Sequence, residues 1–284
     1  MKIPFTKMQG IGNDYIYVNC MSGEYFDPAE LSAVMSPRHM SVGADGLVLI
    51  CSSDIADAKM RMFNADGSEG RMCGNAIRCV GKYLYDNGIV NKENISVETL
   101  SGIKYLTLTV ENEKVTYVSV DMGTASFVPG SIPVLSEDEV INRPIAVPSG
   151  EYRFTAVTVG NPHAVIYAED VDSLDLRKIG PEFENNELFP ERINTEFVKV
   201  ISGTHLQMRV WERGSGETWA CGTGACAVVA ASVKNGICSA NTEITVTLIG
   251  GDLKIVCSDD YRITMRGAAV KVYDGVFDTD DFDI

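Results

Sequence analysis

Two cysteines stand directly before a glycine in matching contexts of this 284-residue chain, one in RMCGNAIRC and one in WACGTGACA. They are Cys73 and Cys221, and each precedes a run with helical composition. The first turn of a helix has unpaired N–H groups and a positive dipole end, which stabilise a thiolate and bind a carboxylate. The glycine lets the backbone approach a ligand closely. We therefore expect two thiols, each beside an anion-binding turn, Gly74–Asn75 and Gly222–Thr223.

Two such thiols suit one reaction class, the inversion of a stereocentre next to a carboxylate. One thiolate would remove the α-proton from one face, while the opposite thiol delivers a proton to the other face. Because the α-C–H bond is a very weak acid, the helix starts and a water-poor cleft would have to stabilise the developing negative charge. The chain has no phosphate-binding loop of the P-loop or Rossmann type, and its lysines have no distinctive setting. No cofactor is therefore expected, and a pyridoxal enzyme is disfavoured.

The remaining cysteines are interpreted as small, reduced core residues. They are Cys20, Cys51, Cys79, Cys226, Cys238 and Cys257. The chain contains no C-x-x-C pair, and its three histidines do not stand at metal-ligand spacing from the cysteines. We expect neither a metal site nor a disulfide framework.

The sequence segments that are predicted to position the two thiols occur twice in the chain. Cys73 and Cys221 lie 148 residues apart, and the same offset places MRMFNADGSEGRMCGN on MRVWERGSGETWACGT without gaps. It also places the GND at Gly12 on the GNP at Gly160, and one NGI segment, residues 87–89, on another, residues 235–237. The same offset aligns matching segments across most of each half, which indicates an internal duplication.

Each half shows the same predicted elements. Apolar residues at helical spacing follow each cysteine and stop at Asn87-Gly88 and Asn235-Gly236, which are good helix ends. Alternating, β-branched segments predict strands around them. These strands are 15–20, 46–51, 95–100, 105–111, 115–121, 154–159, 164–169, 196–201, 206–211, 243–249, 253–257 and 262–266.

The predicted fold class is α+β, with two pseudo-symmetric halves. Each half is a curved, mostly antiparallel sheet rolled around a central helix, and the active site is expected in the cleft between the halves. The break in the strand pattern near residues 121–130 divides the chain into 1–122, which carries Cys73, and 123–267, which carries Cys221. The closing residues 268–284 could return to either half, and they are the candidate segment to complete the first.

The composition excludes several classes of partner. The formal net charge is −15, which disfavours binding to nucleic acid or an anionic membrane. The N-terminal segment has no apolar export signal, and the longest small-apolar run, residues 225–233, is too short to span a bilayer. We expect a cytoplasmic protein that acts on a small molecule.

Five segments together resemble the diaminopimelate epimerase family, over nearly the whole chain. They are KMQGIGNDY, FNADGSEGRMCGNAIRC, GNPH, NTEF and ERGSGETWACGTGACA. The resemblance implies an isomerase that interconverts LL- and meso-2,6-diaminopimelate without a cofactor, in the biosynthesis of lysine and of a cell-wall precursor. It also implies two pseudo-symmetric halves with the site in the cleft, and commonly a homodimer.

The resemblance also assigns roles to residues. Cys73 and Cys221 correspond to the acid/base thiols, and His163 and Glu212 to residues that tune their protonation. The helix-start residues Gly74, Asn75, Gly222 and Thr223 correspond to the binding site of the reacting carboxylate. The other substrate-binding positions are Asn13, Asn64, Asn161, Asn194, Glu212 and Arg213. Arg213 would offer a fixed fork to the distal carboxylate. Gly46 departs from the family, because some relatives carry glutamine there.

Several alternatives remain open from the sequence. A related cofactor-independent racemase or epimerase of proline, hydroxyproline or another amino acid would also use two cysteines, although proline-racemase-like chains typically have histidine after MCG. A carbon isomerase of the phenazine-biosynthesis type lacks the cysteine pair, and a thiol redox protein would join the two thiols. Asn13 and Asn64 could be turn residues, His163 an ordinary half-buried histidine, and Glu212 and Arg213 a surface pair. The sequence does not decide which thiol is the base for the LL substrate.

Overall fold

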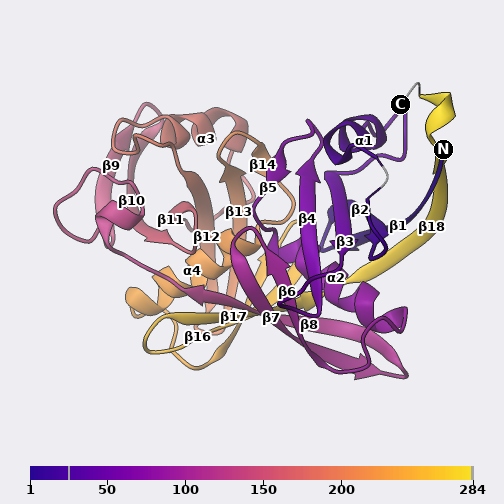
Figure 1. Ribbon diagram of the computed structural model, residues 1–284. Coiled ribbons are helices and arrows are strands. Elements are labelled where there is room, and N and C mark those ends of the chain that lie inside the picture. Colours follow the sequence, from indigo (N-terminus) through magenta and orange to yellow (C-terminus); the bar gives the residue numbers. More distant parts are fainter. Residues whose placement is uncertain (25, 283–284) are drawn as a thin grey trace. The chain divides into compact units, whose positions relative to one another are not determined.

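The computed structural model describes residues 1–24 and 26–282. The chain forms two compact units, one of Met1–Asp121 with Gly267–Ile284 and the other of Met122–Arg266. Each unit contains helices and a mixed sheet, so the α+β fold class is confirmed (Figure 1). Residues 283–284 of the predicted closing segment lie outside the described residues.

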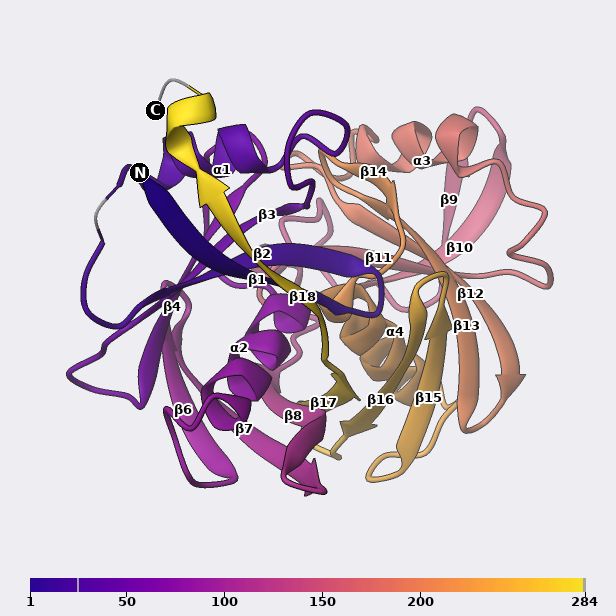
Figure 2. The ribbon, with the colours of Figure 1, turned by 90° about the vertical axis from the view of Figure 1, so that its right-hand side faces the viewer.

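The first unit is a sheet that curves around the helix α2 (Gly74–Asp86). Its other elements are β1 (Lys2–Gly10), β2 (Asn13–Cys20), α1 (Pro28–Met35), β3 (Gly46–Cys51), β4 (Ala58–Asn64), β5 (Glu69–Gly70), β6 (Asn94–Thr99), β7 (Gly102–Glu111), β8 (Lys114–Thr124), β18 (Val270–Asp278) and the 3-10 turn η2 (Thr279–Asp281). Most described strand pairs are antiparallel, while β2–β3 and β4–β6 are parallel. The helix contacts β1, β2 and β7 (Figure 2), and its residues Ile77, Val80 and Leu84 are buried.

The second unit repeats this arrangement around α4 (Gly222–Lys234). Its other elements are the 3-10 turn η1 (Pro129–Ser131), β9 (Arg143–Val147), β10 (Gly150–Thr158), β11 (Pro162–Tyr167), α3 (Leu176–Glu184), β12 (Asn194–Ser202), β13 (His205–Glu212), β14 (Gly216–Thr218), β15 (Glu243–Leu248), β16 (Gly251–Cys257) and β17 (Arg262–Ala268). The parallel pairs are β11–β12 and β13–β15, at the positions that β2–β3 and β4–β6 hold in the first unit. The helix α4 contacts β10, β11, β12, β15 and β16.

The strand register shows the duplication directly. The two central helices have 13 residues each, and both ends of one lie 148 positions from those of the other. The cross-strand partners repeat at the same offset: Tyr15↔Gly46 with His163↔Asn194, Leu47↔Phe63 with Thr195↔Trp211, and Phe63↔Glu69 with Trp211↔Glu217. A one-residue slip would turn each strand's side chains to the opposite face, so a shared register means shared side-chain positions. The predicted two pseudo-symmetric halves are therefore confirmed.

The last strand of the chain belongs to the first unit. β18 pairs antiparallel with β1, as β9 pairs with β10 in the second unit. The sequence left open to which half residues 268–284 return, because β1 and β18 lie at opposite ends of the chain.

Two helices and several strands were missed by the sequence patterns. The helix α1 has eight residues, and the signal for it is local: Oδ1 of Asp27 accepts from the backbone N–H of Ala29 at 2.8 Å, followed by proline in the first turn. The helix α3 contains Pro181, which a pattern search reads as a helix breaker. β1, β4, β5, β9, β14 and β18 are short, or lack clear alternation, or stand next to proline.

No helix in the described part of the chain combines the length and the apolar composition that a membrane crossing needs.

Candidate active site

The thiol of Cys73 stands where α2 begins. Cys73 is the N-cap of this helix, in extended backbone, and it is half-buried. Its Sγ donates to Oδ1 of Asn13 at 3.3 Å. Asn13 begins β2 and lies 60 positions earlier in the chain, so the sheet brings together two residues that the sequence predicted for the site.

A charged network holds Asn13 in place. The amide Nδ2 of Asn13 donates to Oδ2 of Asp45 at 2.7 Å, and Arg38 binds Oδ1 of Asp45 at 2.7 Å. Arg38 and Lys7 also bind Asp14, each at 2.6 Å. Burial alone would raise the pKa of Asp14, but hydrogen bonds and charges from these two cations outweigh it and lower the pKa. The sequence patterns did not find this network, because Lys7 of β1, Asn13 and Asp14 of β2, and the loop residues Arg38 and Asp45 come together only in the folded unit.

The other predicted residues of the first unit differ in setting. Asn75 lies in the first turn of α2 with 2% of its surface exposed. Asn64 is exposed, and its Nδ2 donates to Oγ of Ser68 at 2.9 Å, which is the turn role considered above. A Cβ on Gly46 would lie 2.0 Å from the carbonyl oxygen of Phe63, so this backbone has no room for a side chain at that position.

The thiol of Cys221 occupies the equivalent position at the start of α4, in a different environment. It is 5% exposed, and its Sγ accepts the backbone N–H of Gly224 at 3.3 Å, which caps the helix. The hydroxyl of Thr223 lies 3.5 Å from the sulfur. Burial raises the pKa of the Cys221 thiol well above its usual value, and the negative charges of Glu212 and Glu196 raise it further. Cys221 therefore holds its proton at neutral pH.

Glu212 stands at the end of β13, next to this thiol. Thr218, on the neighbouring strand β14, donates its hydroxyl to Oε1 of Glu212. Burial raises the pKa of Glu212, and a hydrogen bond from Cys221 partly offsets the rise. The carboxyl group therefore lies within hydrogen-bonding reach of the Cys221 sulfur.

His163 is fully buried on β11, rather than half-buried as one alternative had it. Its Nδ1 lies 2.7 Å from Oε1 of Glu196, and its Nε2 lies 2.9 Å from Oδ1 of Asn161. Glu196 was not predicted as a site residue. The sequence signal that could have found it is a charged glutamate inside the segment NTEFVKV, which overlaps a predicted strand. The neighbouring residues of this strand are buried in the structure, and a buried glutamate normally has a partner.

Asn194 and Arg213 lie side by side. Oδ1 of Asn194 accepts the backbone N–H of Arg213 at 2.9 Å, and its Nδ2 donates to the carbonyl oxygen of Pro162 at 2.7 Å. The guanidinium of Arg213 donates through Nη1 to the carbonyl oxygen of Glu191 at 2.8 Å. Asn194 therefore fixes the turn that carries Arg213.

Each cysteine that the structure describes is a thiol. Among residues 1–24 and 26–282, no group of three histidine, cysteine, aspartate or glutamate side chains could hold a metal ion.

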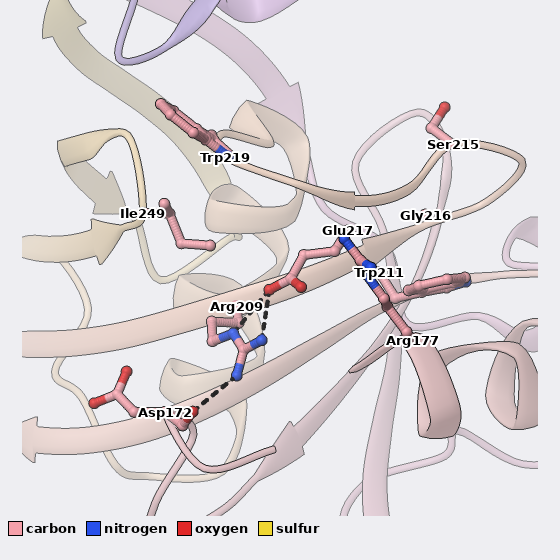
Figure 3. A pocket seen from close by; sticks show the side chains of 9 residues that line it. All are labelled: Asp172, Arg177, Arg209, Trp211, Ser215, Gly216, Glu217, Trp219 and Ile249. Atoms are coloured by element: carbon pink, nitrogen blue, oxygen red, sulfur yellow. Dashed lines mark hydrogen bonds and ion pairs between the residues drawn. The ribbon is translucent and has the colours of Figure 1, made fainter. Parts of the chain in front are cut away.

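A pocket of about 810 Å³ in the second unit contains none of the predicted site residues (Figure 3). Its lining consists of Asp172, Arg177, Arg209, Trp211, Ser215, Gly216, Glu217, Trp219 and Ile249. Arg209 spans it and binds Glu217 through Nε at 2.8 Å, as Arg61 binds Glu69 at 2.8 Å in the first unit. This ion pair is a shared feature of the two β-hairpins that precede the cysteines.

The fold is shared with several solved structures. A probable proline racemase from Agrobacterium radiobacter superposes with a TM-score of 0.70 at 15% identity, covering 99% of this chain and 94% of the other. A PhzF-family phenazine biosynthesis protein from Bacillus anthracis superposes with a TM-score of 0.69 at 16% identity, covering 98% and 99%. These likenesses show that the chain shares the fold of these two proteins.

The sequence comparisons are narrower. The family model described as diaminopimelate epimerase matches residues 5–128 and 155–272. A diaminopimelate epimerase from Acetivibrio thermocellus is 54% identical over 279 residues, covering 98% of this chain and 99% of the relative. One from Methanococcus maripaludis is 53% identical over 276 residues, covering 96% and 99%. The chain belongs to the diaminopimelate epimerase family, as the sequence motifs predicted.

Proposed function

We propose that this protein is an isomerase that interconverts LL- and meso-2,6-diaminopimelate by transferring protons to and from the α-carbon. The observation that carries the proposal is the pair of cysteine N-caps at the starts of α2 and α4, in a chain of this family. Each half supplies one thiol at a helix start, where the N–H groups and the dipole favour a carboxylate.

In this proposal, the thiols of Cys73 and Cys221 act on opposite faces of one carbon. Such chemistry requires the two sulfurs to approach the same substrate, and their placement in a cleft between the halves remains a prediction. The amides of Gly74–Asn75 and Gly222–Thr223 bind the reacting carboxylate and stabilise charge as the α-proton leaves. No cofactor is required for these steps.

The second half supplies a proton donor in its resting state. The raised pKa of Cys221 keeps the sulfur protonated, so this thiol is ready to deliver a proton to the carbon. When Cys221 acts as the base in the reverse direction, its thiol proton first passes to the carboxylate of Glu212, whose own raised pKa makes it a suitable acceptor.

The rest of the substrate is assigned to polar side chains of both units. Asn13, Asn64, Asn161, Asn194, Glu212 and Arg213 bind the amino and carboxyl groups in this proposal. The support is that Asn13 contacts the Cys73 thiol and that Asn194 holds the turn of Arg213. A guanidinium suits the distal carboxylate, because it can donate two parallel hydrogen bonds.

We also propose that the protein works in the cytoplasm as a homodimer, in the biosynthesis of lysine and a cell-wall precursor. The reduced state of the buried cysteines suits a reducing compartment. A dimer contact is supported by apolar side chains on β18 that are exposed to solvent: Val270, Val272, Tyr273 and Val276. Light scattering of the purified protein tests the oligomeric state, and a monomer at micromolar concentration would remove that part of the proposal.

The reaction is tested with the purified protein and LL-diaminopimelate in heavy water. We expect meso-diaminopimelate to form with deuterium at the inverted α-carbon, because the delivered proton comes from a thiol that exchanges with solvent. A panel of other amino acids, including proline and hydroxyproline, is assayed by chiral chromatography in parallel. Inversion without deuterium, or faster turnover of another amino acid, would overturn the proposal.

A further inference from the structure

Glu196 is a fully buried carboxylate to which the proposed function gives no role. Its side chain is 0% exposed, and it lies on β12 between Val165 of β11 and Val210 of β13. Burying an ionised carboxylate among apolar strands is unfavourable unless a partner compensates the charge. The contacts of its two oxygens show what that partner is.

One oxygen of Glu196 has two stabilising neighbours. Oε1 lies 2.7 Å from Nδ1 of His163, whose side chain is also 0% exposed. The same oxygen lies against the first turn of α4, since a Cβ built on Gly224 would lie 2.7 Å from it. The glycine therefore leaves room for the carboxylate at the positive end of the helix. The other oxygen, Oε2, is buried without a hydrogen-bond partner, so His163 is the side chain that satisfies this group.

The ring of His163 lies between two acceptors. Its Nδ1 faces the Glu196 carboxylate, and its Nε2 lies 2.9 Å from Oδ1 of Asn161. A carboxylate oxygen and an amide oxygen both accept hydrogen bonds, so this arrangement is fully satisfied when each ring nitrogen carries a proton. A ring with both protons would be an imidazolium, for which Glu196 is the buried counter-charge.

We propose that Glu196 is a positioning residue of this site, which keeps His163 protonated on both ring nitrogens and thereby holds the side chain of Asn161 in its binding orientation. The inference rests on the proposed function, in which Asn161 binds substrate. Without the carboxylate, the buried ring would lose its counter-charge and one proton, because desolvation disfavours an isolated buried cation. The ring could then no longer hold both neighbours in the present arrangement.

The titratable groups around this pair are Glu212 on β13 and Cys221 at the start of α4. Burial contributes most to the raised pKa of Glu212, the charge of Glu196 raises it further, and the charge of His163 lowers it. The two charges of the pair thus oppose each other at Glu212, whereas at the Cys221 thiol burial raises the pKa most and the charge of Glu196 adds to the rise.

The protonation of His163 can be measured without substrate. The chain has three histidines, and His39 is exposed while His205 is half-buried, so they serve as internal references in a protein labelled with 15N-histidine. We expect both ring nitrogens of His163 to carry protons at a pH at which His39 is neutral. In Glu196→Gln, the ring of His163 should be neutral at that pH. A neutral His163 ring in the unaltered protein, or an unchanged ring in the variant, would overturn the proposal.

A kinetic cycle tests whether Glu196 acts through His163. We expect Glu196→Gln and His163→Asn each to lower kcat/KM by about 10- to 100-fold. The double variant should be no slower than the slower single variant, because both changes remove one unit. Glu139→Gln, which breaks an ion pair with Lys234 elsewhere in the same unit, is the control and should stay within about twofold. If the losses in kcat/KM of the two single variants multiply in the double variant, Glu196 and His163 act independently, and the proposal is contradicted.

The two experiments separate this inference from the proposed function. An unaltered protein that fails to epimerise diaminopimelate would remove the proposed function, while the ring measurement would still decide the protonation of His163. Conversely, an active protein with a neutral His163 ring would leave the proposed function standing and remove this inference.

Discussion

The two units share a register but differ around their thiols. At the offset of 148 residues, the positions of His163 and Glu196 in the second unit correspond to Tyr15 and Val48 in the first. The position of Glu212 corresponds to Asn64. The thiol of the second unit therefore has two carboxylates near it, while that of the first donates to the neutral amide of Asn13.

This difference separates two tasks that one duplicated sequence had to serve. The shared register and the paired helices place a cysteine at a helix start in each half, which is the symmetric requirement of inversion. In the proposed mechanism, the side chains that face each sulfur control its proton, and these side chains differ between the units. The proposed mechanism has two acid/base groups that act on one carbon in turn and begin in different protonation states, so the observed asymmetry fits the proposal.

The largest expected effect is the loss of either thiol. We expect Cys73→Ala and Cys221→Ala each to lower the rate of epimerisation by about 10²- to 10⁴-fold, since no other group can serve the vacated face. The buried thiol of Cys257 lies outside the site, so Cys257→Ala is the matched control and should keep near-normal turnover. If either variant retains full activity, Cys73 and Cys221 are not the two acid/base thiols.

The next largest effect is expected at Glu212, whose position in the first unit holds Asn64. Replacing Glu212 with Gln removes a negative charge that raises the pKa of Cys221, so this pKa should fall. Turnover should nevertheless drop by about 100-fold, because the sulfur loses its proton acceptor. The pH dependence of alkylation of Cys221, followed by mass spectrometry, reports the thiol directly. If the alkylation profile does not move to lower pH, the charge of Glu212 does not raise the pKa of Cys221. The pKa values of the two thiols would then differ less than the structure indicates.

A smaller effect is expected at the turn of the second unit that Asn194 holds. Arg213→Ala should raise KM for diaminopimelate by about 10- to 100-fold, as expected for a lost charge-assisted hydrogen bond. Arg213→Lys keeps the charge but not the planar fork, and it should recover only part of the affinity. Steady-state kinetics separates KM from kcat, and a change confined to kcat would place the arginine near the reacting carbon instead.

The smallest effect on catalysis, but the clearest contrast in stability, comes from pH. The folded pKa of Asp14 is lowered, so its stabilisation is present above the unfolded value of about 3.9 and is lost as the pH falls through the folded value. The folded pKa of Glu212 is raised, so its ionisation removes stability as the pH rises through about 4.3 and above. The two carboxylates therefore predict opposite trends.

Denaturant unfolding of Asp14→Asn and Glu212→Gln across pH 3 to 8 measures both trends. Near pH 7, Asp14→Asn should lower the free energy of unfolding by about 2 kcal/mol, because buried Lys7 loses its partner, and the deficit should shrink toward pH 3. Glu212→Gln should become relatively more stable than the unaltered protein toward neutral pH. Trends of the same sign would contradict the contrast between the units.

The sequence was sufficient for features that are local or repeated. The two central helices, their cysteine caps and the duplication follow from spacing and from short motifs, and the structure places α2 and α4 where these predicted them. The features it could not supply depend on strand pairing. The contact of Glu196 with His163 spans 33 positions, and that of Asn13 with Asp45 spans 32, so neither is visible as a motif. Pro181 hid α3 for the opposite reason, because a local signal argued against a helix that tertiary packing maintains.

The pairing of β18 with β1 affects the order in which the protein can fold during synthesis. The second unit is continuous in the chain, so all of its strands have been synthesised once residue 268 has been added. The first unit must keep the edge of β1 unpaired until residues 270–278 emerge, and the amino group of Met1 then meets Asp280 at 2.6 Å. The ribosome thus makes the first unit first but allows it to close last, and β1 is exposed to aggregation for the longest time.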